Sequence, residues 1–228
     1  MRITPIALTR FAGVAAVTAG LIFIGVQVNH PHLDAETITT TEMAIRSLLK
    51  VLMAALALVG ITGMYLRQVK QTGVLGLVGY LLFAAGYLLM LGTAFAGAFV
   101  LPAITETNPG YVNDAIAVAT GGTPDGDIGL WATVILLQGV GYLAGGLVFG
   151  IALYRARVLV RWAAALLAVS GLVTAALSVM PDALYRFLAW PNGIAMVALG
   201  LSLWQSTRTR TTAYDATPAP RATAAGMR

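Results

Sequence analysis

The sequence contains no cysteine, only two histidines and few charged residues: Asp, Glu, Lys and Arg make up 10% of its 228 residues. Without cysteine the chain has no disulfide, no thiolate nucleophile and no thiolate metal ligand. Soluble domains carry about a quarter charged residues, so a chain this poor in charge cannot cover itself with a surface that faces water. Hydrophobic residues make up 58% of the chain. They occur in long blocks rather than in alternation, which favours membrane-spanning helices over a membrane barrel.

Six apolar segments reach the length of about 20 residues that a helix needs to cross a bilayer. They are residues 9–28, 43–66, 74–101, 129–154, 158–180 and 184–205. The first is longer than the apolar core of a signal peptide and no small-residue cleavage site follows it, so we expect it to be retained. The sequence therefore predicts an all-α, six-helix transmembrane domain over residues 1–205. Residues 206–228, rich in Thr, Ala, Pro and Arg, are expected to be a disordered basic tail.

The charged residues that remain are distributed unevenly between the two sides of the predicted membrane. One side receives a single acid, Asp215, and eleven of the fourteen basic residues: Arg2, Arg10, Arg67, Lys70, Arg155, Arg157, Arg161, Arg208, Arg210, Arg221 and Arg228. Cytoplasmic loops carry an excess of Lys and Arg, so we expect both termini in the cytoplasm. The abundance of Arg, Ala and Gly suggests a bacterial protein, and hence the bacterial plasma membrane. The net charge of +5 follows from this topology and does not indicate binding to nucleic acid.

Three predicted helices end in a similar way on the cytoplasmic side. In residues 60–65, 150–154 and 200–204, a glycine is followed four or five residues later by an aromatic residue. This pattern fits one helical hairpin repeated three times. It equally fits three unrelated helices that each need small residues for packing and an aromatic anchor at the interface.

Glycines are concentrated in the segment 129–154, which carries the G-x-x-x-G pairs Gly141–Gly145 and Gly146–Gly150. Such pairs allow the backbones of two helices to approach closely. We expect this helix to be central, packed against the segment 74–101 or against another subunit of a homo-oligomer.

The segment 43–66 brings charge into the membrane. Glu42, Arg46 and Lys50 follow at intervals of four residues, so they share one helical face, and Lys50 lies about 12 Å along the axis from Glu42. Charges inside spans are costly and usually face a partner or a cavity. In one interpretation Arg46 pairs with Glu42 while Lys50 extends outward along its butyl chain. In the other, Arg46 and Lys50 line an outward-facing pocket that binds a phosphate or carboxylate group.

Further polar residues fall at a comparable depth, namely Gln27, Gln138 and Asn192. Asn192 follows Pro191, which is expected to kink the last helix and free a carbonyl group. Together these residues predict a cavity between the outer halves of the helices, although each alone also fits a hydrogen bond between two helices.

Both histidines lie in one short stretch, GVQVNHPHLD, at residues 25–34. In an extended segment alternate residues point the same way, so His30, His32 and Asp34 are candidate metal ligands. The stretch also fits the outer end of the first helix, where Pro31 would terminate the helix because it excludes helical geometry at His30. A third interpretation is a pH-sensitive element. Haem in a helical bundle usually takes histidines from within the spans, and none lies there, so no cofactor is expected.

The chain resembles small, largely uncharacterised six-span membrane proteins of actinobacterial type. The resemblance rests on Arg10-Phe11-Ala12-Gly13, Gln27, His30-Pro31, Tyr65 to Gln68, Arg161 to Leu166 and Pro191-Asn192-Gly193. It implies a six-span membrane fold and assigns no functional residue.

Three functions are compatible with these features. The first is a non-enzymatic membrane protein that binds or moves a small lipophilic or anionic molecule through the outer cavity. The second is an intramembrane enzyme acting on a lipid or prenyl-type substrate; this requires an acid or base within the spans, and only Glu42 approaches that position. The third is a structural subunit of a membrane complex. The bilayer is the partner common to all three.

Overall fold

The computed structural model describes residues 4–176 and 190–207, and within these ranges the chain forms helices and turns without any strand. The predicted all-α fold is therefore confirmed for this part of the chain. The elements are α1 (Pro5–Gly25), η1 (Thr37–Thr39), α2 (Thr41–Arg67), α3 (Val69–Phe95), the π-helix η2 (Ala96–Val100), α4 (Leu101–Ile104), α5 (Pro109–Ala119), α6 (Trp131–Ala156), α7 (Arg161–Ala176) and α9 (Trp190–Gln205).

Within residues 4–176 and 190–207, four helices are long and apolar enough to cross a membrane: α1, α2, α6, and the stretch from α3 through α4, Val69–Ile104. The predicted spans 158–180 and 184–205 correspond to α7 and α9, which are each 16 residues long as described. Residues 177–180 and 184–189 of these two spans, and the predicted tail from residue 208 onward, lie outside the described residues.

Side chains that accept hydrogen bonds from the first free amides mark three of the helix starts. Thr4 precedes Pro5 and accepts from the Ala7 amide at 3.2 Å, and Thr40 accepts from the Met43 amide at 3.4 Å. Asn108 caps α5 in the same way. Ser, Thr and Asn are favoured at this position, and Pro is favoured directly after it, so the sequence itself sets where these helices begin.

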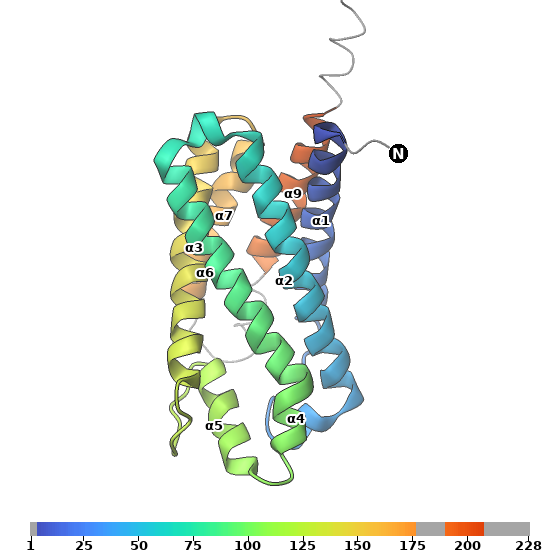
Figure 1. Cartoon of the computed structure of the whole chain (residues 1–228), viewed down its shortest axis with the longest axis vertical. Helices are drawn as coiled ribbons and strands as arrows, with labels where there is room; N and C mark the ends of the chain where they lie inside the picture. Colours follow the sequence, from blue (N-terminus) through green and yellow to red (C-terminus); the bar gives the residue numbers. More distant parts are fainter. Residues whose placement is uncertain (1–3, 177–189, 208–228) are drawn as a thin grey trace, which may run out of the picture.

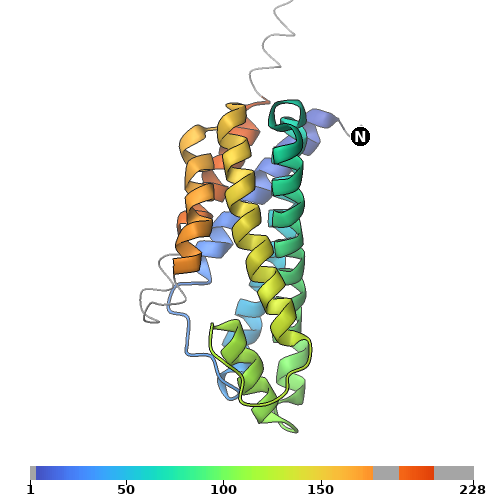
Figure 2. The same cartoon turned by 90° about the vertical axis from the view of Figure 1, so that its left-hand side faces the viewer.

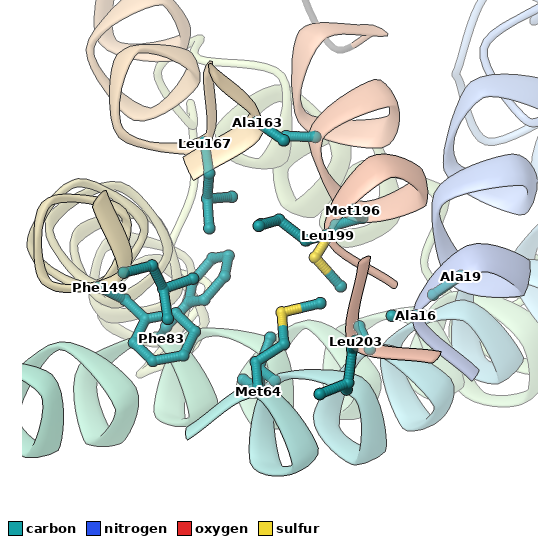
Figure 3. Close-up of a cluster of buried hydrophobic side chains, with 14 of the residues drawn as sticks. Ala16, Ala19, Met64, Phe83, Phe149, Ala163, Leu167, Met196, Leu199 and Leu203 are labelled. Atoms are coloured by element: carbon teal, nitrogen blue, oxygen red, sulfur yellow. The ribbon is translucent and has the colours of Figure 1, made fainter. Parts of the chain in front are cut away.

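The long helices pack as a closed ring in chain order. Each of α1, α2, α3, α6, α7 and α9 contacts the next, and α9 returns to α1. Figures 1 and 2 show the bundle with the start of α1, the α2–α3 turn and the end of α9 at the top, and α4 and α5 at the bottom. All six helices contribute to one buried core, shown in Figure 3: Ala16, Ala19, Met64, Phe83, Phe149, Ala163, Leu167, Met196, Leu199 and Leu203.

Glycine permits the close contact of α3 with α6. A methyl group on Gly79 would lie 2.5 Å from the Phe149 amide nitrogen. One on Gly145 would overlap the backbone of Phe83. The predicted packing of the glycine-rich helix against its predecessor is therefore confirmed, whereas its use in a homo-oligomer stays a prediction.

Helix α3 is interrupted near its start, and the predicted span 74–101 begins just beyond the interruption. Gly73 adopts φ 56° and ψ −149°, a conformation that glycine adopts without the steric penalty of a side chain. At its other end α3 continues through the π-helix η2 into α4. Pro102 lies directly after this π turn, where its ring excludes regular helical hydrogen bonding.

The segments at the end of the bundle opposite the α2–α3 turn form a small second core beneath the ring. Its buried residues are Ala35, Ile38, Leu101, Val112, Ala115 and Ile116. The Asn113 side-chain oxygen accepts from the Ala35 amide at 2.8 Å, and the Trp131 indole donates to the Ala115 carbonyl at 3.1 Å. The short helix α5 is thus tied both to the loop after α1 and to the start of α6.

Apart from Arg46 and Lys50 on α2, the described charges separate along the bundle axis. One end, here called the basic end, carries Arg10, Arg67, Lys70, Arg155, Arg157 and Arg161. The other, the acidic end, carries Asp34, Glu36, Glu42, Glu106, Asp114, Asp125 and Asp127. Hydrogen bonds from Arg10 to Thr207 and from Arg67 to Ser206 bring the end of α9 to the basic end.

Candidate functional site

Lys50 lies on the interior seam of α2. The buried positions of this helix follow intervals of three and four residues, and Lys50 falls into that series: Met43, Ser47, Lys50, Ala54, Ala57, Ile61 and Met64. Ser47 on one side is 6% exposed and Ala54 on the other is fully buried. Lys50, itself half-buried, therefore lies on the side of α2 that carries its buried residues.

Arg46, one turn nearer the acidic end, holds the end of α1. Its Nη1 donates to the carbonyl oxygens of Val26 at 3.0 Å and Val28 at 3.1 Å, and its Nη2 donates to that of Asn29 at 3.1 Å. Its Nε donates to Glu42 Oε1 at 2.9 Å, and Nη2 forms an ion pair with the same oxygen at 2.8 Å. The Arg46–Glu42 pair predicted from the spacing is confirmed. The remaining donors of Arg46 satisfy carbonyl groups that the helix end leaves without partners.

The end of α1 corrects the predicted role of Pro31. The helix ends at Gly25, before the predicted boundary at residue 28, and the chain turns through residues 26–29. Asn29 adopts φ 47°, a left-handed conformation that asparagine tolerates better than most residues. Because the helix ends six residues before Pro31, the proline is not what terminates it.

His30 links this turn to Lys50. Its Nδ1 lies 2.9 Å from the Pro31 carbonyl oxygen, and its Nε2 lies 3.2 Å from Lys50 Nζ. A carbonyl oxygen can only accept, so Nδ1 carries the proton, and Nε2 then accepts from the Lys50 ammonium group. The contacts thus favour a neutral imidazole beside a charged lysine.

The three candidate metal ligands are not brought together. His30 faces Lys50, whereas the Asp34 carboxylate accepts from the backbone amides of Glu36 at 3.0 Å and Thr37 at 2.7 Å. The Thr37 backbone and side-chain hydrogen bonds are the main reason that the pKa of Asp34 lies below its usual value of 3.8. No group of three or more metal-binding side chains occurs in residues 4–176 and 190–207.

The other predicted site residues form separate contacts between helices. Gln138 on α6 accepts from the Thr93 hydroxyl of α3 at 2.7 Å. Buried Asn192 on α9 donates to Tyr87 on α3 at 3.4 Å. Gln27 is half-buried in the turn after α1. Gln138 and Asn192 thus bond to helix α3. The predicted kink at Pro191 depends on residues 184–189, which lie outside the described residues.

The sequence interpretation missed Ser47 and the carbonyl groups of Val26, Val28 and Asn29. Ser47 shares the interior seam with Lys50, and the interval of three residues between them was the available signal. The carbonyl groups carry no signal in the sequence, because only the packing of α1 against α2 brings them to Arg46.

The apolar helices of the described residues indicate a membrane protein, and Lys50 lies on one of them toward the acidic end of the bundle. No family model, curated protein or solved structure matches this chain. The resemblance to small six-span membrane proteins of actinobacterial type therefore stays a prediction.

Proposed function

We propose that this protein is a six-span protein of a bacterial plasma membrane, with both termini in the cytoplasm, that binds or moves a small lipophilic molecule bearing an anionic group. The molecule enters from the acidic, outward-facing end of the bundle. Lys50 contacts its anionic group, and the apolar interior surrounds the rest.

The position of Lys50 carries this proposal. A lysine on the lipid-facing side of a helix can extend its amine to the interface with little cost. Lys50 instead occupies an interior position between Ser47 and Ala54, where a charge is costly and is commonly functional. The hydrogen bond to His30 holds the ammonium group in place, so a carboxylate or phosphate meets a cation that is already oriented.

Arg46 supports the site without serving as its second cation. Its side chain is 15% exposed, and its guanidinium group donates to the end of α1 and to Glu42. We assign it the role of fixing the turn that carries His30. Of the two cations expected from the sequence to bind the anionic group, we therefore assign only Lys50 to the ligand.

An enzymatic function gains no specific support. In the described part of the chain, Glu42 is the only carboxylate on the long apolar helices, and its side chain is 58% exposed and paired with Arg46. Both features oppose a proton-transfer role within the membrane. Among the described residues, no contact specifically favours the alternative that the protein is a structural subunit of a membrane complex.

Contacts of two helix pairs support a repeat within the proposed six-span fold. A methyl group on Gly150 would meet the Ala164 carbonyl and the Ala168 amide of α7, and one on Gly200 would meet the Gly13 carbonyl and the Val17 amide of α1. In α7 the two partners lie three and seven residues after Arg161, and in α1 they lie three and seven residues after Arg10. Gly60 departs from the pattern, because it faces Ala16 on α1.

Binding of oleate by the purified protein in nanodiscs tests the function. Oleyl alcohol, which has the same chain without the charge, is the matched ligand. We expect oleate to bind and the Lys50→Gln variant to bind it at least fivefold more weakly, with little change for oleyl alcohol. Equal binding of oleate by the wild-type protein and Lys50→Gln would remove the basis of the proposal.

Single cysteines at positions 70, 123 and 210 test the topology, since the chain has no cysteine of its own and Thr123 is exposed in the loop after α5. A maleimide that cannot cross the membrane should label only position 123 in intact cells. Labelling at position 70 or 210 would contradict the cytoplasmic placement of the basic end.

A further inference from the structure

A pocket opens between α3 and α6 at the basic end, far along the bundle from Lys50. Its volume is about 260 Å³, and it is lined by Gln71, Thr72, Val74, Leu75, Ala152 and Arg155. Gly73 lies between the two pairs of α3 residues, so the pocket surrounds the point where α3 departs from helical geometry. None of its lining residues takes part in the proposed outer site.

The positive charge at this pocket favours an anionic ligand. Arg155 lines it directly, and five further basic residues belong to the same end of the bundle. Every Asp and Glu in residues 4–176 and 190–207 belongs to the acidic end. The exposed Gln71 adds a hydrogen-bonding side chain beside the arginine, whereas the Thr72 hydroxyl donates to the Gln68 carbonyl oxygen at 3.0 Å. An arginine with a neutral donor beside it suits a phosphate group.

The surface next to the pocket is apolar and faces outward. Val74 is 77% exposed and Leu75 is 36% exposed, and both continue along the lipid-facing side of α3. Tyr154, adjacent to Arg155, lies under the guanidinium group of Arg161 at 4.2 Å. Aromatic residues of this kind are typical of the level of the lipid headgroups. The pocket thus joins a polar, cationic cavity to a hydrocarbon-facing surface.

The size of the pocket limits its occupant to a headgroup. A volume of 260 Å³ equals that of roughly nine water molecules in the liquid and is smaller than the pockets of about 300–1,000 Å³ that enclose whole drug-sized ligands. We infer that the pocket binds the phosphate headgroup of an anionic phospholipid, while its acyl chains lie outside against Val74 and Leu75. Basic pockets between spanning helices bind such headgroups on the cytoplasmic side of membranes.

Native mass spectrometry of delipidated protein in detergent tests this site with phosphatidylglycerol and with phosphatidylcholine of identical acyl chains. Arg155→Ala and Gln71→Ala alter exposed lining residues and should leave the fold intact. Arg157→Asn is the matched control, because it removes a neighbouring charge outside the pocket and asparagine tolerates the φ of 57° at that position.

We expect wild-type protein to retain phosphatidylglycerol in preference to phosphatidylcholine. One basic residue near a membrane surface contributes about 1 kcal/mol, so Arg155→Ala should weaken phosphatidylglycerol binding about fivefold. Gln71→Ala should weaken it less, and Arg157→Asn less than twofold. Equal binding of the two lipids, or an equal loss for Arg155→Ala and Arg157→Asn, would overturn the site. Displacement of phosphatidylglycerol by glycerol 3-phosphate would overturn the lipid assignment, since it would show a site for soluble phosphate esters.

Discussion

The contact between α3 and α6 predicts opposite effects for two glycine-to-alanine substitutions on one helix. At Gly145 the added methyl group would overlap the amide nitrogen and Cα of Phe83 and lie 2.7 Å from the Leu82 carbonyl carbon. At Gly139, two turns nearer the acidic end, no atom lies within 4 Å of the added group. Gly145→Ala therefore forces two backbones apart, whereas Gly139→Ala does not.

The size of the effect follows from this geometry. Non-bonded carbon atoms prefer a separation of about 3.5–4.0 Å, so the helices must separate by about 1 Å around Phe83, which is 1% exposed. Overpacking of this kind costs about 1–3 kcal/mol. Both variants share the helix-propensity gain of about 1 kcal/mol, so the difference between them isolates the packing cost.

Thermal unfolding of the purified protein in detergent measures that difference. Each kcal/mol shifts the midpoint by about 2–4 °C in a chain of 150–250 residues. Gly145→Ala should therefore unfold about 5 °C below Gly139→Ala, with Gly139→Ala at or above the wild type. Equal midpoints for the two variants would refute the close packing of α3 on α6.

Three further predictions concern the acidic end of the bundle. Arg46→Lys should lower the free energy of unfolding by about 2 kcal/mol, because an ammonium group cannot satisfy the carbonyl groups to which the guanidinium group donates. Glu42→Gln is the comparison and should lower the free energy of unfolding by less. Equal losses for the two variants in chemical denaturation would contradict the role of Arg46 in holding the end of α1. Because the pKa of Asp34 is lowered in the folded protein, the unfolded state binds the proton more readily. The charged carboxylate therefore stabilises the loop above the usual Asp pKa of 3.8, and this stability is lost as the pH falls through the lowered pKa. Hydrogen exchange of residues 34–40 at pH 5 and pH 3 should show this loss, and a loss of equal size in Asp34→Asn would assign it to other groups. Trp131→Phe removes the hydrogen bond that ties α5 to the start of α6, so proteolysis around α5 should be faster. An unchanged rate of cleavage would contradict this role of Trp131.

The sequence was sufficient to predict those features that depend on local composition. Hydropathy and length alone locate α1, α2, α3 and α6, because a bilayer span requires only a run of apolar residues. The ion pair of Arg46 with Glu42 could also be predicted, since an interval of four residues places both on one helical face.

Features set by tertiary packing could not be predicted in the same way. The spacing of Lys50 placed it on one face with Glu42 and Arg46, yet only the contact of α2 with its neighbours shows that Lys50 falls into the series of buried positions. The acceptors of Arg46 are backbone carbonyl groups brought from α1, and carbonyl groups have no sequence signature. The histidine pair resembled a metal site because its spacing was suitable, but Asp34 is turned toward its own loop amides.

Photo-crosslinking with a diazirine-labelled fatty acid tests the central claim that Lys50 binds the anionic group of a lipophilic molecule inside the bundle. We predict that crosslinked peptides come from the interior seam of α2 near Lys50 and from the end of α1. We also predict that unlabelled oleate prevents the crosslinks and that Lys50→Gln abolishes them. Crosslinks on the exposed side of α2, at Leu48 and Leu52, that are equal in Lys50→Gln would contradict the account.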